Sequence, residues 1–207
     1  MGVSIKGFFY RVFIDPLING LRRRVASMIL PGEKVIDIAC GTGVLSLAMA
    51  RHASHVTGID LSEDMITTGR HMAQKRQASN VSFGMLDATD LSCFPDHSFD
   101  VAVSSLAMHQ FDPETGVKVL REMSRIAKRI IIADYNCPMK TGPAAWLVWS
   151  IECAARGDHY RNFRKYISRD GINRLAAEAG LTIISREERG EGVFMIAGMV
   201  LMVADSN

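Results

Sequence analysis

The fold of this chain is decided by Val35-Ile36-Asp37-Ile38-Ala39-Cys40-Gly41-Thr42-Gly43-Val44-Leu45-Ser46-Leu47. A β-branched run leads through small residues into an apolar helical pattern, which predicts a strand, a tight turn and a helix whose N-terminus faces the turn. We expect Ala39, Gly41 and Gly43 to let a ligand lie against the main chain, because larger side chains there would block it. Asp37, on the approach to the turn, can orient the loop or accept hydrogen bonds from the ligand.

The turn admits more than one interpretation. A dinucleotide-binding turn has the pattern G-x-G-x-x-G, which places a pyrophosphate at the helix N-terminus. Here Ala39 stands at the first glycine position and Ser46 at the third, so that pattern fits poorly. A structural strand–turn–helix with no ligand remains open as well. The choice depends on whether ligand-binding positions recur at the ends of later strands.

Such a position recurs at the end of the next strand. Residues 55–60 predict a second strand that ends in Asp60. The Asp60 carboxylate can accept hydrogen bonds from both hydroxyls of a ribose, although this does not distinguish one nucleoside from another. Ser62 is predicted to cap the following helix, whose first turn is acidic.

Two further predicted strands also end in polar side chains. Residues 81–88 predict a third strand ending in Asp87, which can accept from an adenine amine beside the Ala88 backbone. Residues 94–104 predict a turn and a fourth, apolar strand that ends at Ser104. Since parallel strands end at one edge of a sheet, these positions are expected to converge.

In this order the segments resemble the class I S-adenosylmethionine-dependent methyltransferases. Asp37-x-Ala39-x-Gly41-x-Gly43 is similar to their motif I, and Asp60, Asp87-Ala88 and Ser98-Phe99-Asp100 follow as in that family. The resemblance implies a Rossmann-like, doubly wound α/β fold, with a seven-stranded, mostly parallel sheet, an antiparallel C-terminal hairpin and helices on both faces. It also implies S-adenosylmethionine as cofactor and S-adenosylhomocysteine as product. The residues implied to bind the cofactor are Asp37, Ala39, Cys40, Gly41, Gly43, Asp60, Leu61, Met65, Asp87, Ala88 and Ser104.

Within that family the chain most resembles the ubiquinone- and menaquinone-biosynthesis methyltransferases and their small-molecule relatives. The similarity rests on Tyr10, Asp15-Pro16-Leu17, the loop 39–43 and Leu106-Ala107-Met108-His109. It is strong over the cofactor half and weak over 136–170, where substrate selection is expected. It implies direct displacement of the methyl group onto a small-molecule acceptor, with a preference for an apolar or amphiphilic, quinone- or lipid-like molecule. Whether oxygen, nitrogen or carbon is methylated stays open.

His109 is the candidate catalytic base. It follows the fourth strand at the carboxyl edge of the sheet, where open α/β sheets bind ligands, and an imidazole suits proton removal near neutral pH. Alternatively, His109 hydrogen-bonds a loop carbonyl or packs beneath the pocket. Relatives that methylate planar amines carry Asn/Asp-Pro-Pro-Tyr where this chain has residues 104–107, which argues against that chemistry. Cys137 is expected to pack rather than to act as a nucleophile.

Periodicity predicts the remaining organisation. An N-terminal helical cap is expected within residues 1–32, with its helix over 16–29, and a catalytic domain over 33–207. Strands and helices are expected to alternate five times between 35 and 135, with one helix beginning at Asp112-Pro113. Helices are expected over 143–156 and 170–179, and hairpin strands over 182–189 and 193–204.

The segment 136–170 is predicted to be a substrate-capping insertion. Its aromatic side chains could line an acceptor pocket or form the core of a capping helix pair, and core is favoured for the tryptophans. These side chains, with the residue just before the segment, are Tyr135, Trp146, Trp149, His159, Tyr160, Phe163 and Tyr166.

The N-terminal helix has three interpretations. It can be a lid, with Phe8, Phe9 and Tyr10 closing on the cofactor; it can dock permanently on the sheet; or, with Arg22-Arg23-Arg24, it can make weak contact with an anionic membrane surface. Docking or lidding is favoured, because an amphipathic helix beside a domain usually covers its core.

Composition limits the remaining function classes. The 207 residues suit one domain with 48% hydrophobic content, and the net charge of +2 is too small to indicate a nucleic-acid partner. No signal peptide is recognised, the apolar runs are shorter than the roughly 20 residues of a membrane span, and the cysteines show no metal-binding spacing. We therefore expect a cytoplasmic protein with no metal and with free, mostly buried thiols; its oligomeric state stays open. The rival functions are a non-catalytic cofactor-binding scaffold and, less favoured, an NAD-dependent oxidoreductase, for which no Tyr-x-x-x-Lys is present.

Overall fold

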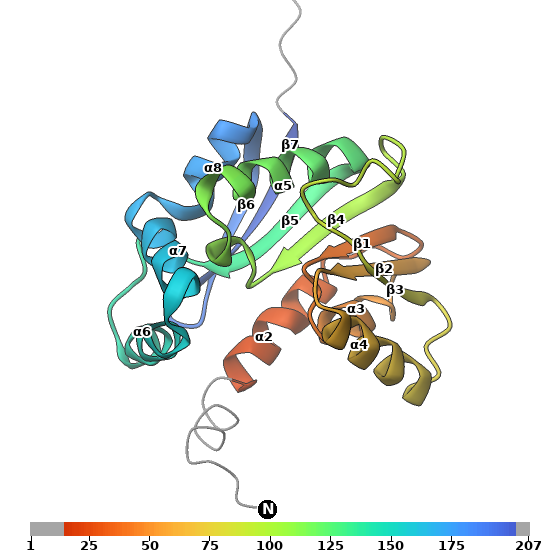
Figure 1. The fold of residues 1–207 in the computed structure, drawn as a ribbon, viewed down its shortest axis with the longest axis horizontal. Coiled ribbons are helices and arrows are strands. Elements are labelled where there is room, and N and C mark those ends of the chain that lie inside the picture. The colour runs from red at the N-terminus through yellow and green to blue at the C-terminus, as the bar shows by residue number, and fades with distance from the viewer. Residues whose placement is uncertain (1–14, 202–207) are drawn as a thin grey trace, which may run out of the picture.

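The structure, a computed structural model, describes residues 15–201. They form a seven-stranded sheet in the order β3-β2-β1-β4-β5-β7-β6 (Figure 1). The neighbours from β3 to β5 are parallel, and β7 is antiparallel to both β5 and β6. This confirms the predicted mixed sheet with its antiparallel terminal hairpin. The strands are β1 (Lys34–Ile38), β2 (His55–Asp60), β3 (Val81–Met85), β4 (Phe99–Ser105), β5 (Ala127–Tyr135), β6 (Leu181–Arg189) and β7 (Phe194–Leu201).

Helices cover both sides of the sheet, as predicted. α5 packs on β4 and β5 and against α8, whereas α3 packs on β2 and against α2, on the other side (Figure 1). α6 and α7 pack on each other beyond the end of β5, and α7 also contacts η2. The helices are α2 (Asp15–Ala26), α3 (Val44–Met49), α4 (Glu63–Lys75), η2 (Met108–Gln110), α5 (Pro113–Ile126), α6 (Pro143–Ala155), α7 (Gly157–Ser168) and α8 (Gly171–Ala179).

The register of the parallel strands brings their carboxyl ends to one edge. Ile38 of β1 lies beside Ile59 of β2 and Ser104 of β4. The turns after these strands therefore begin at the same level, and they build the site described below.

The N-terminal helix is docked on the domain. Leu21 and Val25 are fully buried in the core, and the Arg24 Nε–H donates to Glu187 Oε2 of β6 at 2.8 Å. The predicted helix over 16–29 ends earlier, at Ala26, because the chain then tightens into turns in which Met28 N bonds Val25 O. In this structure α2 is packed on the domain, as the docking interpretation expects, while Phe8, Phe9 and Tyr10, invoked for a lid, lie outside the described residues.

The expected alternation of strands and helices was wrong at one place. No helix lies between β3 and β4: residues 86–98 form turns in which Asp87 accepts from Thr89 N and Asp90 from Ser92 N, and such Asx turns compete with a helix. Residues 157–168 form α7, which packs on α6 and buries Phe163 and Tyr166, in keeping with the helix-pair alternative for the capping segment.

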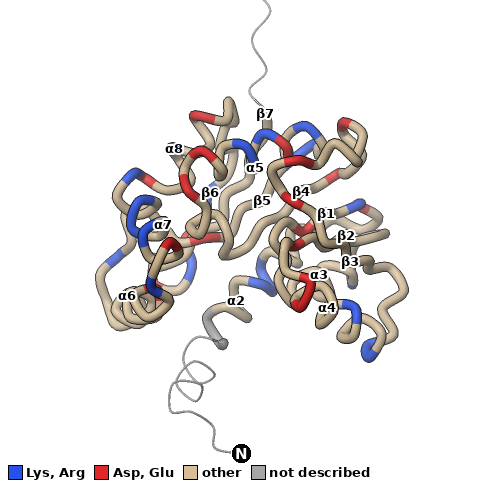
Figure 2. The backbone as a smooth tube through the Cα atoms, viewed as in Figure 1, with Lys and Arg blue, Asp and Glu red and all other residues tan. Residues whose placement is uncertain are grey.

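The distribution of charge and thiols is ordinary. Figure 2 shows Lys and Arg interspersed with Asp and Glu over most elements, in keeping with the net charge of +2. All the cysteines are free, but the expectation that most are buried was wrong, since Cys93 and Cys153 are exposed. Within residues 15–201 no helix combines the length and apolarity that crossing a bilayer requires.

Candidate functional site

The loop after β1 has a left-handed backbone. Ala39, Gly41 and Gly43 have φ values of +55°, +55° and +72°. A Cβ atom at Gly43 would lie 2.3 Å from the ring of Phe83, so this glycine is required by packing. At Gly41 a Cβ atom would meet nothing within 4 Å, and this glycine faces a cavity. The expectation that a Cβ in this loop would block a ligand therefore does not account for Gly43.

Asp60 joins the loop to the next helix. Its Oδ2 accepts from Gly41 N at 2.8 Å and its Oδ1 accepts from Ser62 N at 2.9 Å. Ser62 in turn caps α4, as predicted, by accepting from Met65 N. Each carboxylate oxygen keeps a second lone pair, so Asp60 can still accept two hydrogen bonds from a ligand.

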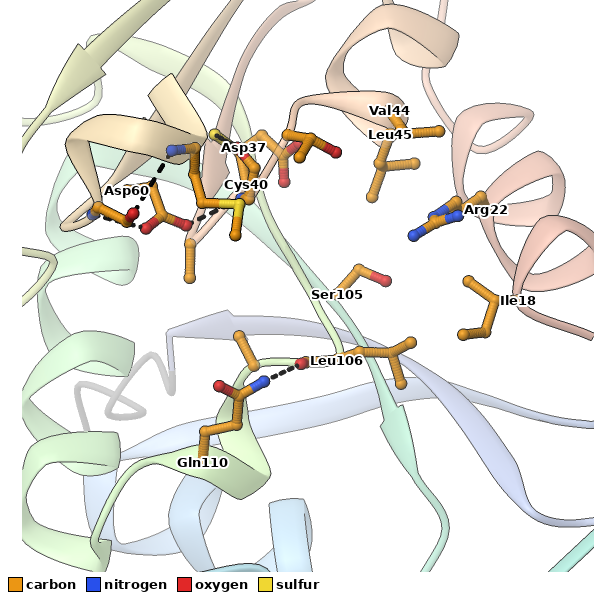
Figure 3. A pocket seen from close by; sticks show the side chains of 16 residues that line it. Ile18, Arg22, Asp37, Cys40, Val44, Leu45, Asp60, Ser105, Leu106 and Gln110 are labelled. Carbon is orange, nitrogen blue, oxygen red and sulfur yellow. Dashed lines mark hydrogen bonds between the residues drawn. The ribbon is translucent and has the colours of Figure 1, made fainter. Parts of the chain in front are cut away.

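Two cavities meet at Asp60. The larger, of about 550 Å³, lies between the loop, α2 and the turn after β4 (Figure 3), and the smaller, of about 480 Å³, lies beside β3 and α5. The residues common to both linings are Ala39, Asp60, Ala107 and Gln110. Together they form one crevice along the carboxyl edge of the sheet.

Most of the predicted cofactor residues line this crevice. The larger cavity is lined by Asp37, Ala39, Cys40, Gly41, Asp60 and Met65, and the smaller by Ala39, Asp60, Leu61, Asp87 and Ala88. Gly43 and Ser104 line neither cavity. The Ser104 side chain is fully buried, and its neighbour Ser105 reaches the larger cavity instead, since successive strand residues face opposite ways.

The larger cavity contains a buried acid and a cation. The Ser46 hydroxyl donates to Asp37 Oδ2 at 2.6 Å, and burial raises the pKa of Asp37 to about 7. Arg22 of α2 extends into the cavity from the opposite side, together with Ile18 (Figure 3), and its charge partly offsets the rise. Burial also raises the pKa of the Cys40 thiol, which is therefore neutral at pH 7.

Arg22 and Leu106 are lining residues that the sequence did not single out. Arg22-Arg23-Arg24 was considered for contact with a membrane surface, yet Arg22 enters the cavity and Arg24 pairs with Glu187. The position of Arg22 four residues after the buried Ile18, and therefore on the same side of α2, was the available signal. Leu106, opposite the loop, has φ +55°, a backbone conformation that is unfavourable for a residue with a bulky side chain. The Leu106 N–H donates a hydrogen bond to Ala133 O, which holds the residue in this conformation.

His109 lies beside the crevice rather than in its wall. It is buried, and its Nδ1 lies 2.6 Å from Asp134 Oδ1. Its Nε2 lies 3.7 Å from Glu152 Oε1 of α6, and Glu152 Oε2 lies 2.6 Å from His159 Nε2 of α7. Burial by itself lowers the pKa of His109, but the charge and hydrogen bond of Asp134 outweigh it and raise that pKa. A base role for His109 stays a prediction, and Asp134 and Glu152 were not foreseen.

The capping segment differs from expectation in its tryptophans. Trp146 is 78% exposed and Trp149 37%, so assigning them to the core was wrong. Helix α6 is apolar on every side, and periodicity could not show that Ala145, Val148 and Glu152 face inward. Cys137 is 4% exposed, and burial raises the pKa of its thiol to about 12, which confirms that it packs.

Sequence comparison finds relatives over most of the chain. A model of the methyltransferase domain family matches residues 29–162. The ubiquinone biosynthesis O-methyltransferase of Pseudomonas fluorescens is 30% identical over 179 residues, which cover 82% of this chain and 72% of that one. The demethylmenaquinone methyltransferase of Clavibacter sepedonicus is 36% identical over 110 residues, covering 52% of this chain and 43% of its own.

Structural comparison finds the same fold in solved proteins. Magnesium protoporphyrin IX methyltransferase from Synechocystis PCC 6803, solved with bound S-adenosylhomocysteine, superimposes with a TM-score of 0.67 at 20% identity, covering 98% of this chain and 90% of that one. The PH0226 protein of Pyrococcus horikoshii OT3 gives a TM-score of 0.68 at 22% identity, covering 94% and 98%.

Proposed function

We propose an apolar or amphiphilic small molecule with a quinone-like ring as the methyl acceptor of this chain, which belongs to the methyltransferase domain family and is an S-adenosylmethionine-dependent methyltransferase. The observation that carries the proposal is the apolar wall of the larger cavity opposite the glycine loop, formed by Ile18, Leu106 and Ala107. Relatives named for ubiquinone and menaquinone biosynthesis support the same class of acceptor.

We infer that the methyl donor lies along the crevice and occupies both cavities. We infer that the adenine lies in the smaller cavity, where Leu61 is 64% exposed and offers an uncovered apolar surface, near Asp87 and Ala88. The ribose then lies at Asp60, the junction of the cavities. The amino-acid end lies in the larger cavity, with its carboxylate toward Arg22 and its ammonium group toward Asp37 and the loop.

Methyl transfer requires little of the side chains beyond positioning the acceptor. When bound, S-adenosylmethionine supplies a methyl group on a positively charged sulfur, which is already an activated leaving group. The chain's task is to hold the acceptor in line with that group, and such positioning is worth roughly 7–11 kcal/mol of the barrier. Cys40 lines the cavity as a neutral thiol, so it adds no anionic nucleophile.

The test uses labelled S-adenosylmethionine and matched acceptors. A catechol with an isoprenoid tail, the same catechol without the tail, and an exocyclic amine such as adenosine are compared. We expect the tailed catechol to have the highest kcat/KM. Methylation of the amine alone would refute the proposed acceptor class and leave the methyl-donor assignment intact.

A variant pair tests the apolar wall itself. Leu106→Asn removes the apolar contact while suiting the left-handed backbone, because asparagine tolerates positive φ well. Since burying a leucine is worth about 1.5–3 kcal/mol, we expect a roughly 10–100-fold rise in KM for the tailed catechol, with unchanged affinity for S-adenosylhomocysteine. Ile184→Asn, at a 62% exposed position on β6, is the control and should leave both values unchanged.

A further inference from the structure

Two histidines and a glutamate from three separate elements converge beside the donor crevice. His109 belongs to η2, Glu152 to α6 and His159 to α7, at the end of the sheet where these elements meet (Figure 1). Their nitrogen and oxygen atoms all lie within 4.8 Å of one another. His109 and Glu152 are buried, and the His159 side chain is 33% exposed, so the cluster has one side toward solvent.

His109 is oriented as metal-binding histidines are. Its Nδ1–H donates to Asp134 Oδ1 at 2.6 Å, which leaves the lone pair of Nε2 directed toward Glu152. Histidine ligands of metals almost always donate their other ring N–H to a carboxylate or carbonyl group in this way. Asp134 is itself fixed, since its oxygens also accept from Tyr135 N at 2.7 Å and from His109 N at 3.3 Å.

Glu152 is fixed as well, and it lies close to a second buried carboxylate, Asp134, through their shared partner His109. Its Oε1 accepts from the Tyr135 hydroxyl at 2.7 Å. Glu152 and Asp134 are both buried carboxylates, and among the ion pairs of residues 15–201 they have only histidine partners. Burying two carboxylates is costly unless cationic partners compensate them, and one divalent ion would supply two positive charges with both imidazoles neutral.

The spacing suits ligands of one ion. The 3.7 Å between His109 Nε2 and Glu152 Oε1 is too long for a hydrogen bond. Two ligands of a tetrahedral zinc ion, each about 2.0–2.1 Å from the metal, lie roughly 3.3–3.5 Å apart. A shift of a few tenths of an ångström would therefore bring these two atoms into a zinc coordination shell, and the 2.6 Å hydrogen bond between His159 Nε2 and Glu152 Oε2 would have to open by about 0.7 Å to admit the ion.

We propose that His109 Nε2, the Glu152 carboxylate and His159 Nε2 bind one Zn²⁺ ion, with Asp134 orienting His109. Two imidazole nitrogens and one carboxylate are a ligand set that zinc accepts, with a fourth position left for water. The ion would join α6 and α7 to η2. Because Gln110, the next residue of η2, lines both cavities, the ion would fix one wall of the crevice without touching the substrate.

The experiment measures metal binding directly, on the full chain without a histidine tag. The protein is stripped with a chelator, dialysed and titrated with Zn²⁺ by calorimetry, and Co²⁺ is then used as a probe whose visible absorption reports nitrogen ligation. We expect one equivalent of Zn²⁺, a raised melting temperature, and no comparable binding of Mg²⁺, which prefers oxygen ligands.

Variants then identify the ligands. Glu152→Gln and His159→Gln should each weaken Zn²⁺ binding by more than the roughly 10–100-fold expected for Asp134→Asn, which removes only an orienting partner. His71→Gln, at an exposed histidine of α4, is the matched control and should bind as wild type does. Circular dichroism checks that each variant is folded, and the partly exposed His159 position should tolerate glutamine even if the Glu152 position does not.

The proposal has clear contrary outcomes. It is wrong if the wild-type chain takes up no Zn²⁺, if both glutamine variants bind as much as wild type, or if Mg²⁺ is preferred. Binding of S-adenosylhomocysteine is measured separately in the same preparations. A chain that binds this nucleoside but no metal would overturn the zinc site alone.

Discussion

Removing the Asp60 carboxylate should abolish tight binding of the nucleoside. Asp60→Ala deletes a group that accepts from Gly41 N and Ser62 N and that keeps one lone pair on each oxygen for a ribose hydroxyl. Hydrogen bonds to a charged group contribute about 1.5–3 kcal/mol each. Two of them amount to about 3–6 kcal/mol, so we expect Kd to rise by roughly two to four orders of magnitude.

The assay is calorimetry with S-adenosylhomocysteine, and Asp64→Ala is the control. Asp64 is an exposed acid in the first turn of α4, so its loss changes the local charge equally without touching the crevice. Loosening of the glycine loop could also weaken binding, and a 2′-deoxy analogue of the ligand separates the two causes. If Asp60 binds the ribose, the missing hydroxyl weakens binding to wild type but has little further effect on Asp60→Ala. Equal affinities of Asp60→Ala and Asp64→Ala would refute the reasoning.

Four further predictions concern other parts of the site. Arg22→Met should weaken binding of S-adenosylhomocysteine about tenfold, but it should not weaken binding of 5′-methylthioadenosine, which lacks the amino-acid end. Equal losses of affinity for the two ligands, measured by calorimetry, would show that Arg22 does not bind the amino-acid end. The pKa of Asp37 is about 7 in the folded chain and 3.8 in the unfolded chain. Between pH 3.8 and about 7 only the folded chain keeps this proton, so the free energy of unfolding falls as the pH rises through that range. Urea unfolding of wild type against Asp37→Asn at several pH values should show this difference, at most about 1.4 kcal/mol per pH unit, and a constant difference would contradict it. His109→Ala should lower the free energy of unfolding by about 3–5 kcal/mol, because Asp134 loses its buried partner, whereas a role as base alone would lower kcat and leave that free energy unchanged. Trp146→Ser should change the free energy of unfolding by no more than about 0.5 kcal/mol, since the side chain is 78% exposed; a large loss would show that it is buried in an assembly.

Most residues that line the crevice could be predicted because they are specified locally. Asp37 lies in β1, Asp60 ends β2, and Asp87 follows the end of β3 by two residues; parallel strands bring such positions to one edge without further information. The pairing of strand ends is a property of the fold class, so no long-range contact had to be guessed.

Residues were missed where the decisive contact is remote in the chain. Arg22 lies in an arginine triplet that a solvated helix face explains equally well, and only the docking of α2 turns it into the cavity. Ser104 and Ser105 are adjacent in the sequence, and the strand register decides which of them reaches the cavity. Sequence periodicity gives neither the docking geometry nor the register at a strand's last residue.

Helix α6 shows how one polar residue could have corrected an ambiguous pattern. Its sequence is apolar on every side, so tryptophan burial was assigned from residue type alone. Glu152 is the single charged residue of that helix, and an ionised carboxylate enters an apolar interior only where partners compensate it. Either the glutamate faces solvent and the tryptophans are inside, or it faces a buried polar cluster and the tryptophans are outside. The presence of His109 beyond β4 and His159 on the next helix favours the second arrangement, because both imidazoles need polar partners. The unexplained charge in an apolar helix was therefore the best available indicator of which face is buried.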